Sequence, residues 1–314
     1  MLDIGANDGT LLRGYATDPV VKVGFEPARN LIPVAQLSAD TVINDFFNYD
    51  AWHKQFPGKK AKVVTAIAMF YDLEDPNAFV RDVAKLLHED GVFIIQMSYL
   101  PLMLSQNAFD NICHEHLEYY SLRSLEHLLA RHKLAVCDVE LNDVNGGSFR
   151  VYIRHEGGGK HLRIPEGANE RIAALHAEEK KLELSERKAY DAFAKRVEEL
   201  KAKTVQFINN AKKRREKIYV YGASTKGNTL LQYYGLNHGH VPFAVERNPQ
   251  KWGKKTVGSR VPIISEEQAR ADAPHYFLIL PWHFLPEFRE REKEFFARGG
   301  KFIVPLPELK IIGE

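Results

Sequence analysis

Three acidic residues follow short apolar runs near the amino end of the chain, where they could bind the hydroxyls of a nucleoside. Asp3 is expected to close the first strand of an open α/β sheet, and Glu26 and Asp45 follow the next two apolar runs. One carboxylate can accept hydrogen bonds from both hydroxyls of a ribose. After Asp3, Gly5 and Gly9 lack a Cβ, so the backbone can turn sharply and lie against a ligand. The pattern predicts a nucleoside site, and a tight strand–helix turn without a ligand is the alternative.

The spacing of the two glycines indicates which nucleoside would bind. A dinucleotide fold uses Gly-x-Gly-x-x-Gly to seat a pyrophosphate on a helix N-terminus, whereas this loop places Asn7 and Asp8 between its glycines. Asp8 would repel a pyrophosphate but tolerate the cationic sulfonium and amino group of S-adenosylmethionine. The loop and its distant Glu26 resemble those of class I S-adenosylmethionine-dependent methyltransferases. The residues expected to bind this cofactor are Asp3, Gly5, Asn7, Asp8, Gly9, Glu26, Pro27, Asp45, Phe46 and Ala66.

A histidine-rich string from residue 111 to 121, Asn-Ile-Cys-His-Glu-His-Leu-Glu-Tyr-Tyr-Ser, could supply a general base. It follows an expected strand and therefore lies near the carboxyl edge of the sheet, where open α/β proteins bind ligands. Histidine suits proton abstraction because its unperturbed pKa is near neutrality. Zinc binding is an alternative, but the spacing His-Glu-x-x-His and a third ligand are not evident, so no metal is predicted. Polar side chains satisfied beneath a loop are the other alternative.

Composition narrows the class of protein. The 314 residues carry a net charge of +2, from 43 basic and 41 acidic residues, which gives no electrostatic case for binding nucleic acid or a membrane. Two cysteines, Cys113 and Cys137, exclude a disulfide framework and a four-cysteine zinc site and fit a reducing compartment. Charged residues within the first 20 positions exclude a secretory signal, and no segment is apolar enough to span a membrane. We therefore expect a cytoplasmic protein.

Apolar periodicity and turn residues predict an α/β protein in three parts. The first, over residues 1–160, alternates strands and helices in the manner of a class I methyltransferase (Rossmann-like) domain. Residues 161–216 form a helical connector, rich in Ala, Glu, Lys and Leu with apolar residues at helical spacing. Residues 217–314 form a second, smaller Rossmann-like domain. The strands expected after the first three lie at 61–68, 91–97, 136–141, 149–154, 217–221, 241–245, 276–280 and 302–304, and Ser124 is expected to cap a helix.

Two further loops could contact a substrate. Residues 222–228, Gly-Ala-Ser-Thr-Lys-Gly-Asn, join a strand to a helix and combine small residues, hydroxyls and a lysine, which suits a phosphate as well as a plain turn. Residues 145–148, Asn-Gly-Gly-Ser, join the last two strands of the first domain and suit a hairpin turn. Trp282 follows a later strand and is expected to belong to the core more than to a base-stacking surface.

Four motifs in order resemble the sugar C-methyltransferases, which act on nucleotide-linked deoxyketosugars. They are residues 3–12, His114 to Ser121, residues 145–150 and residues 222–231. The resemblance implies a central cofactor domain and a C-terminal domain that helps to bind the nucleotide sugar; the family's N-terminal zinc-binding module is expected to be missing here. The family's catalytic string, approximately Tyr-x-Glu-His, carries over as Glu115 and His116, with Cys113 in place of the tyrosine and Tyr71 near a position where many members have histidine.

The resemblance therefore implies C-methylation of a nucleotide-linked 4-keto deoxysugar through an enolate generated by His116, with the oligomeric state left open. The expected catalytic residues are His116, Glu115, Tyr71 and Tyr119. The expected substrate-binding residues are His114, Asn145, Gly147, Ser148, Arg150, Gly222, Ser224, Lys226, Asn228, Glu246 and Arg247. An O- or N-methyltransferase of a small polar acceptor and an inactive nucleotide-sugar-binding fragment are the alternative functions.

Overall fold

The computed structural model describes residues 1–15, 17 and 19–313, and these form two compact units. Unit 1 comprises Met1–Leu100, Leu117–Asn142 and Gly147–Leu182. Unit 2 comprises Pro101–His116, Asp143–Gly146 and the chain from Glu183 on. The predicted boundaries lie at residues 160 and 216, whereas the two units divide after Leu182, and two short segments of the expected first domain belong to unit 2.

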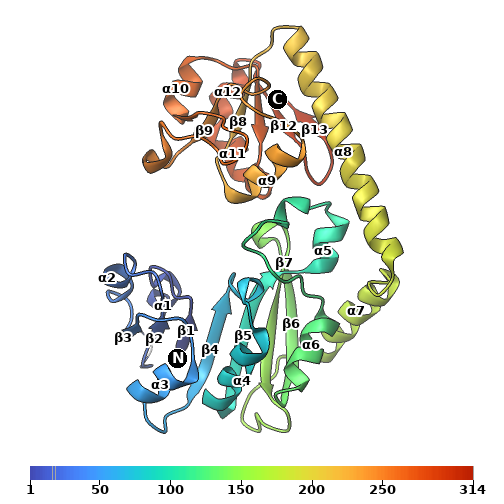
Figure 1. Cartoon of the computed structure of the whole chain (residues 1–314). Coiled ribbons are helices and arrows are strands. Elements are labelled where there is room, and N and C mark those ends of the chain that lie inside the picture. Colours follow the sequence, from blue (N-terminus) through green and yellow to red (C-terminus); the bar gives the residue numbers. More distant parts are fainter. Residues whose placement is uncertain (16, 18, 314) are drawn as a thin grey trace. The chain divides into compact units, whose positions relative to one another are not determined.

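Unit 1 is built on a sheet with the strand order β3-β2-β1-β4-β5-β7-β6, in which β7 runs antiparallel to both of its neighbours (Figure 1). This arrangement confirms the predicted α/β class. Its strands are β1 (Leu2–Ile4), β2 (Val23–Phe25), β3 (Thr41–Ile43), β4 (Ala61–Ile67), β5 (Leu87–Ser98), β6 (Leu134–Asn142) and β7 (Ser148–His155). Its helices are α1 (Thr10–Arg13), α2 (Ile32–Ala35), α3 (Tyr49–Gln55), η1 (Phe70–Asp72), α4 (Pro76–Leu86), α6 (Leu122–Ala130) and α7 (Ala168–Lys181).

Local sequence explains why the helices of unit 1 begin where they do. Asp75 caps α4 by accepting a hydrogen bond from the Ala78 N–H, and Pro76 occupies the first turn, where its missing N–H costs nothing. Ser121, and not the predicted Ser124, is the N-cap of α6; the two serines form a reciprocal capping box. The apolar faces of these helices then pack against β5 and β6, which closes the core on that side of the sheet.

Unit 2 contains a second sheet, with the order β10-β9-β8-β11-β12-β13, parallel except for β13. Its strands are β8 (Ile218–Tyr221), β9 (Ala244–Glu246), β10 (Ile263–Ser265), β11 (Tyr276–Ile279), β12 (Lys301–Val304) and β13 (Lys310–Ile312). Its helices are α5 (Leu100–Ser105), η2 (Phe109–Asn111), η3 (Val144–Gly146), α8 (Arg187–Lys213), α9 (Thr225–Tyr233), η4 (Pro249–Lys251), α10 (Glu266–Ala271), η5 (Trp282–Phe284), α11 (Leu285–Arg291) and α12 (Lys293–Ala297).

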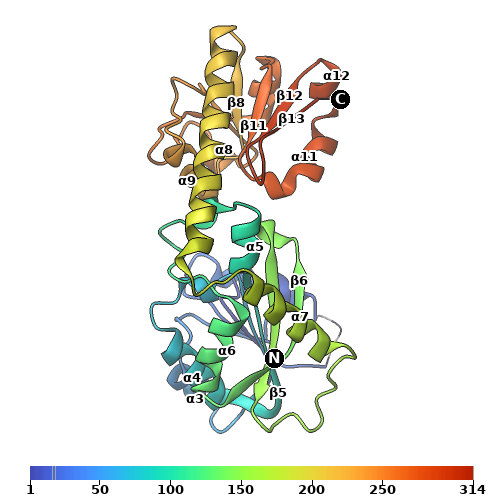
Figure 2. The same cartoon turned by 90° about the vertical axis from the view of Figure 1, so that its right-hand side faces the viewer.

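The predicted helical connector is not a separate body. Helix α7 belongs to unit 1, and α8, a helix of 27 residues, belongs to unit 2 and runs beside β8 and β11 (Figure 2). Its buried positions include Phe193, Val197 and Ile208, which lie on one face at helical spacing, as the sequence predicts. Among the described residues, no helix is both long enough and apolar enough to cross a membrane.

The sequence pattern misplaces or misses several strands. The strand predicted at 241–245 begins only at Ala244, and the short strands β10 and β13 are absent from the prediction. Each of these two has three residues, too few for a period-2 pattern to stand out. Asp3 does not close β1, because the strand continues through Ile4.

Candidate active site

The glycine loop after β1 and the acid after β2 form one hydrogen-bonded structure in unit 1. The Gly5 N–H bonds to the Phe25 carbonyl at 2.9 Å, which brings the loop beside the end of β2. The buried Glu26 carboxylate then accepts the Asn7 N–H on Oε2 at 2.8 Å and the Ala28 N–H on Oε1 at 2.7 Å. Glycine suits this loop because Gly5 has a φ of +73°, in the left-handed region.

This geometry leaves Glu26 able to hold a ribose. Within the described residues each carboxylate oxygen accepts one N–H, so each keeps acceptor capacity for one hydroxyl. Gly9 has a φ of +77°, and a Cβ there would lie 3.1 Å from the Ala35 backbone, so no larger residue fits the turn without strain. The residues present therefore fit the adenosyl group of S-adenosylmethionine.

The other predicted cofactor residues lie at varied depths in unit 1. Asp45, Pro27 and Phe46 are exposed where β2 and β3 end, and Phe46 keeps 75% of its surface accessible. Asp8 accepts the Thr10 N–H at 3.0 Å, which stabilises the first turn of α1. Ala66 is fully buried in β4, opposite Ile4.

Asp3 does not present its carboxylate at the strand end. Its Oδ1 accepts the Thr65 hydroxyl at 2.6 Å within the sheet, and only 4% of the residue is exposed. Burial raises the pKa of Asp3 to about 6, although the Thr65 hydrogen bond opposes this rise. The expectation that three carboxylates meet at one edge of the sheet therefore does not extend to Asp3, while Glu26 and Asp45 follow the ends of β2 and β3.

The segment that follows His116 is anchored on η1 in unit 1. The N–H groups of Leu117 and Glu118 both bond to the Tyr71 carbonyl, at 2.9 and 3.0 Å. Because these hydrogen bonds join the two segments, the predicted catalytic residues Tyr71 and Tyr119 lie on neighbouring segments. Tyr71 is buried and Tyr119 is half-buried.

Of the predicted substrate-binding residues in unit 1, Arg150 is hydrogen-bonded within the sheet and Ser148 is buried. The Arg150 guanidinium donates to Gln96 Oε1 at 2.9 Å and lies 3.6 Å from Glu140 Oε2, so its partners are on the strands beside it. Ser148 is buried at the start of β7. Gly147, with a φ of +116°, completes the turn before it, as the hairpin prediction required.

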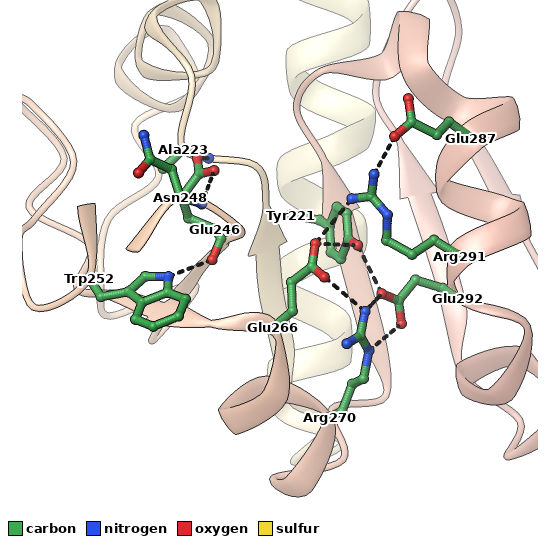
Figure 3. Close-up of polar contacts among 10 residues, drawn as sticks. All are labelled: Tyr221, Ala223, Glu246, Asn248, Trp252, Glu266, Arg270, Glu287, Arg291 and Glu292. Atoms are coloured by element: carbon green, nitrogen blue, oxygen red, sulfur yellow. Dashed lines mark hydrogen bonds and ion pairs between the residues drawn. The ribbon is translucent and has the colours of Figure 1, made fainter. Parts of the chain in front are cut away.

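Unit 2 contains a loop-and-acid structure like that of unit 1, and Figure 3 draws its Glu246, Ala223 and Asn248. The Gly222 N–H bonds to the Val245 carbonyl at 2.9 Å, as Gly5 bonds to Phe25. The Glu246 carboxylate accepts the Ala223 N–H on Oε2 at 3.2 Å and the Asn248 N–H on Oε1 at 3.1 Å. Thus each unit places an acid at the carboxyl end of its second strand, Glu26 just after β2 and Glu246 as the last residue of β9, and ties it to the glycine loop after its first strand.

One added contact distinguishes Glu246 from Glu26. Lys251 Nζ lies 3.1 Å from Glu246 Oε2 and also donates to the Ala223 carbonyl at 2.9 Å. Although burial opposes the change, hydrogen bonds from Asn248, Lys251 and Ala223 lower the pKa of Glu246 below its usual value. Glu246 is therefore ionised at neutral pH.

A cavity of about 350 Å³ adjoins this loop in unit 2. Four of the predicted substrate residues line it: Gly222, Ser224, Glu246 and Arg247. Tyr221, Glu266 and Arg291 also line it. Behind them Arg270 bridges Glu266 and Glu292, and the Tyr221 hydroxyl lies 3.1 Å from Glu266 Oε1 and 2.8 Å from Glu292 Oε1 (Figure 3). Glu292, which follows α11, is almost fully buried, and these partners satisfy its carboxylate. Because Arg270 and Glu266 belong to α10 and Tyr221 to β8, the network holds α10 and the end of α11 against β8.

Residues of the histidine-rich string and of α9 line a second cavity of unit 2, with a volume of about 650 Å³. His114, Glu115 and Asn228, all predicted from the sequence, line it together with Thr225 and Tyr233. Both His114 and Glu115 are exposed, and the His114 Nε2 lies 4.0 Å from the Glu115 carboxylate. The string and the helix after the glycine loop therefore share one surface.

His116 lies deeper than its two neighbours in the string and is half-buried. Burial and the charge of Lys226 lower the pKa of His116 below 6.5, against a hydrogen bond with the Asn111 backbone and the charge of Glu115, which raise it. Lys226 itself donates to the Asn145 carbonyl at 3.1 Å, which links α9 to the hairpin tip. At neutral pH the His116 imidazole is thus neutral, the form in which it can accept a proton.

Sequence reasoning missed Asp110, whereas Trp282 packs against the core of unit 2, as predicted. Asp110 Oδ2 accepts the Trp282 indole N–H at 3.2 Å, and a Cβ on Gly146 would lie 2.8 Å from the Trp282 ring. No pattern in the neighbouring residues distinguishes Asp110 in the sequence. Only the fold brings it near enough to Lys226 for the charge of Lys226 to act on it. In the part of the chain that the structure covers, no three His, Cys, Asp or Glu side chains gather to hold a metal ion.

Comparison with known proteins identifies the class. A family described as a methyltransferase domain matches residues 1–139, and one described as a C-methyltransferase C-terminal domain matches residues 143–307. The chain is 34% identical over 313 residues to the C-methyltransferase NovU of Streptomyces niveus, an alignment that covers 99% of this chain and 73% of NovU. The chain belongs to this C-methyltransferase family. It is an S-adenosylmethionine-dependent methyltransferase, so the enzyme class and cofactor predicted from the sequence are confirmed.

Solved structures match over part of the chain. A possible histamine N-methyltransferase of Thermotoga maritima is 14% identical and covers 49% of this chain and 80% of its own, with a TM-score of 0.38. An S-adenosylmethionine-dependent methyltransferase of Clostridium acetobutylicum is 13% identical and covers 49% of this chain and 82% of its own, with a TM-score of 0.39.

Proposed function

We propose that this C-methyltransferase acts on a nucleotide-linked 4-keto deoxysugar and methylates the carbon beside the ketone. The observation that carries the nucleotide part is Glu246, which is bonded to its glycine loop as Glu26 is bonded to the loop of unit 1. An acid in this position suits a ribose or deoxyribose hydroxyl, and the adjoining cavity offers Arg247 and the α9 N-terminus to a phosphate.

The cofactor side of the reaction belongs to unit 1. S-adenosylmethionine supplies an electrophilic methyl group on its sulfonium. Glu26 would hold the ribose hydroxyls, and Phe46 offers an exposed aromatic surface after β3. Asp8 leaves this side of the loop negative, which suits the cationic groups of the cofactor.

We assign proton abstraction to His116. A 4-keto group acidifies the neighbouring C–H bond, and the neutral imidazole would take that proton onto a ring nitrogen while the electron pair moves into the enolate. Glu115 would orient His116 or hold a sugar hydroxyl, and Tyr71 and Tyr119 are the candidate donors to the developing oxyanion. A positioned base contributes about 10²–10⁴-fold to such a step.

The proposal is tested by solvent exchange. The full chain with S-adenosylhomocysteine is incubated in D₂O with a panel of nucleoside diphosphate-linked 4-ketosugars, and deuterium at the carbon beside the ketone is followed by NMR. Wild type should catalyse exchange with at least one of them. His116→Gln should slow exchange and methyl transfer at least about 100-fold without changing affinity for S-adenosylhomocysteine. The exposed His238 in the same unit provides the matched control, His238→Gln, which should behave as wild type.

Three outcomes would contradict the proposal. Methyl transfer to an oxygen or nitrogen acceptor without exchange would make the chain an O- or N-methyltransferase. Binding of a nucleotide sugar with neither exchange nor transfer would leave an inactive binding protein. Normal turnover by His116→Gln would remove His116 as the base.

A further inference from the structure

The chain leaves unit 1 after Leu100 and returns to it at Leu117, and this excursion, residues 101–116, ends on His116. Both of its ends are hydrogen-bonded within unit 1. The Leu100 N–H bonds to the Tyr120 carbonyl at 2.9 Å, and the Leu117 N–H bonds to the Tyr71 carbonyl at 2.9 Å. His116 therefore directly precedes a returning stretch, residues 117–121, that unit 1 holds in place.

A single side chain from a distant helix joins the two ends of the excursion. Glu179 of α7 accepts the Tyr99 hydroxyl on Oε1 at 2.7 Å and the Leu122 N–H on the same oxygen. Its Oε2 accepts the Arg123 N–H at 3.1 Å. Tyr99 lies just before the excursion, and Leu122 lies just after the returning stretch. One carboxylate thus closes the base of the whole segment that carries the histidine-rich string.

The surroundings of Glu179 give this contact a fixed geometry. The residue is only 6% exposed, and the Tyr99 ring stacks on Phe149 of β7 with a centroid distance of 4.6 Å. The first N–H groups of a helix have no partner within it and favour a negative charge. Ser121 and Ser124 already cap α6, however. The feature that Glu179 adds is the link from α6 to Tyr99, across the base of the excursion.

Helix α7 has another polar anchor, which does not involve the excursion. Arg171, near the start of the helix, donates to Asp138 of β6 from Nε at 2.8 Å and from Nη2 at 2.7 Å. The loss of either anchor weakens the contact of α7 with the rest of unit 1. Only the loss of Glu179 also releases the ends of the segment on which His116 lies.

We propose that Glu179 is a positioning residue for His116, because it holds the two ends of the excursion together and so fixes the point from which the imidazole reaches the substrate. This inference rests on the proposed function, since it concerns His116 as the base. Glu179 acts through the backbone of residues 117–121 and takes no part in the proton transfer. A displacement of a catalytic group by about 1 Å can cost about 100-fold in rate.

Three substitutions in the full chain remove these contacts by degrees. Glu179→Ala removes all three acceptors, Glu179→Gln keeps one acceptor oxygen, and Tyr99→Phe removes one donor and keeps the ring. We expect kcat for methyl transfer to fall roughly 10- to 100-fold in Glu179→Ala and by less in the other two, with the Kd for S-adenosylhomocysteine unchanged. Arg171→Met is the matched control, which should lose stability and keep the wild-type kcat.

Amide hydrogen exchange shows whether the effect is local. Exchange in a peptide that covers residues 117–121 should be faster in Glu179→Gln and Tyr99→Phe than in wild type, while exchange in β4 stays at the wild-type rate. Arg171→Met should not change exchange in residues 117–121. Equal acceleration in β4 and in residues 117–121 would mean that Glu179 only stabilises unit 1, and would overturn the inference.

A double substitution shows whether Glu179 acts through His116. Adding Glu179→Gln to His116→Gln should cause no further loss of kcat, because the positioned group is already gone. A loss equal to the product of the two single losses, or wild-type kcat in all three variants of Glu179 and Tyr99, would refute the positioning role. Normal turnover by His116→Gln alone would instead refute the proposed base, and it would leave the exchange of residues 117–121 as it is.

Discussion

Glu26→Gln is the substitution that most directly tests the cofactor site. The change is nearly isosteric, but it removes the charge and replaces one acceptor oxygen by an amide NH₂. Glu26 accepts the Asn7 and Ala28 N–H groups, so one of these donors loses its partner, and one ribose hydroxyl loses a charged acceptor.

The expected magnitude follows from these contacts. A hydrogen bond to a charged group contributes about 1.5–3 kcal/mol, and every 1.4 kcal/mol is tenfold in affinity. We therefore expect the Kd for S-adenosylhomocysteine to rise about 10- to 150-fold. The unpaired N–H should also lower the free energy of unfolding by about 1–3 kcal/mol.

Isothermal titration calorimetry with S-adenosylhomocysteine measures the first effect, and urea denaturation the second. Glu246→Gln is the matched control, because it makes the same change in the same local geometry of unit 2. It should leave S-adenosylhomocysteine affinity at the wild-type value. Wild-type affinity in Glu26→Gln, or equal weakening by both substitutions, would refute the assignment of the cofactor to Glu26.

Two further predictions concern unit 1. Burial raises the pKa of Asp3 from 3.8 to about 6, so the folded state holds the Asp3 proton more tightly than the unfolded state does. Ionised Asp3 therefore lowers the free energy of unfolding progressively between pH 4 and pH 6, and by its full amount above pH 6. Asp3→Asn, which can still accept the Thr65 hydroxyl, should thus have a higher Tm than wild type at pH 7 and an equal one near pH 4; equal Tm values at both would exclude this effect. Arg171→Met should lower the free energy of unfolding, because the buried Asp138 carboxylate loses the cation that lies 2.7 Å from it. It leaves the buried Asp138 without its bidentate partner, so adding Asp138→Asn should restore part of the loss in urea denaturation, and no recovery would argue against a charge effect.

The sequence determined the parts of this protein that depend on neighbouring residues. The glycine loops, the acids Glu26 and Glu246 and the strand–helix order follow from local patterns, since turn residues and apolar periodicity act over a few positions. The motif around His116 is visible for the same reason. The class of enzyme therefore follows from short stretches of the chain, each of which carries its own signal.

Only the tertiary structure decided how distant segments are combined. It places residues 101–116 and 143–146 with unit 2, buries Asp3 against Thr65, and brings Asp110, Lys226 and Trp282 into one cluster. Such pairings join residues far apart in the sequence, and no local pattern marks a polar residue for burial. Desolvation and opposite charge determine them, and both arise only when the chain is packed.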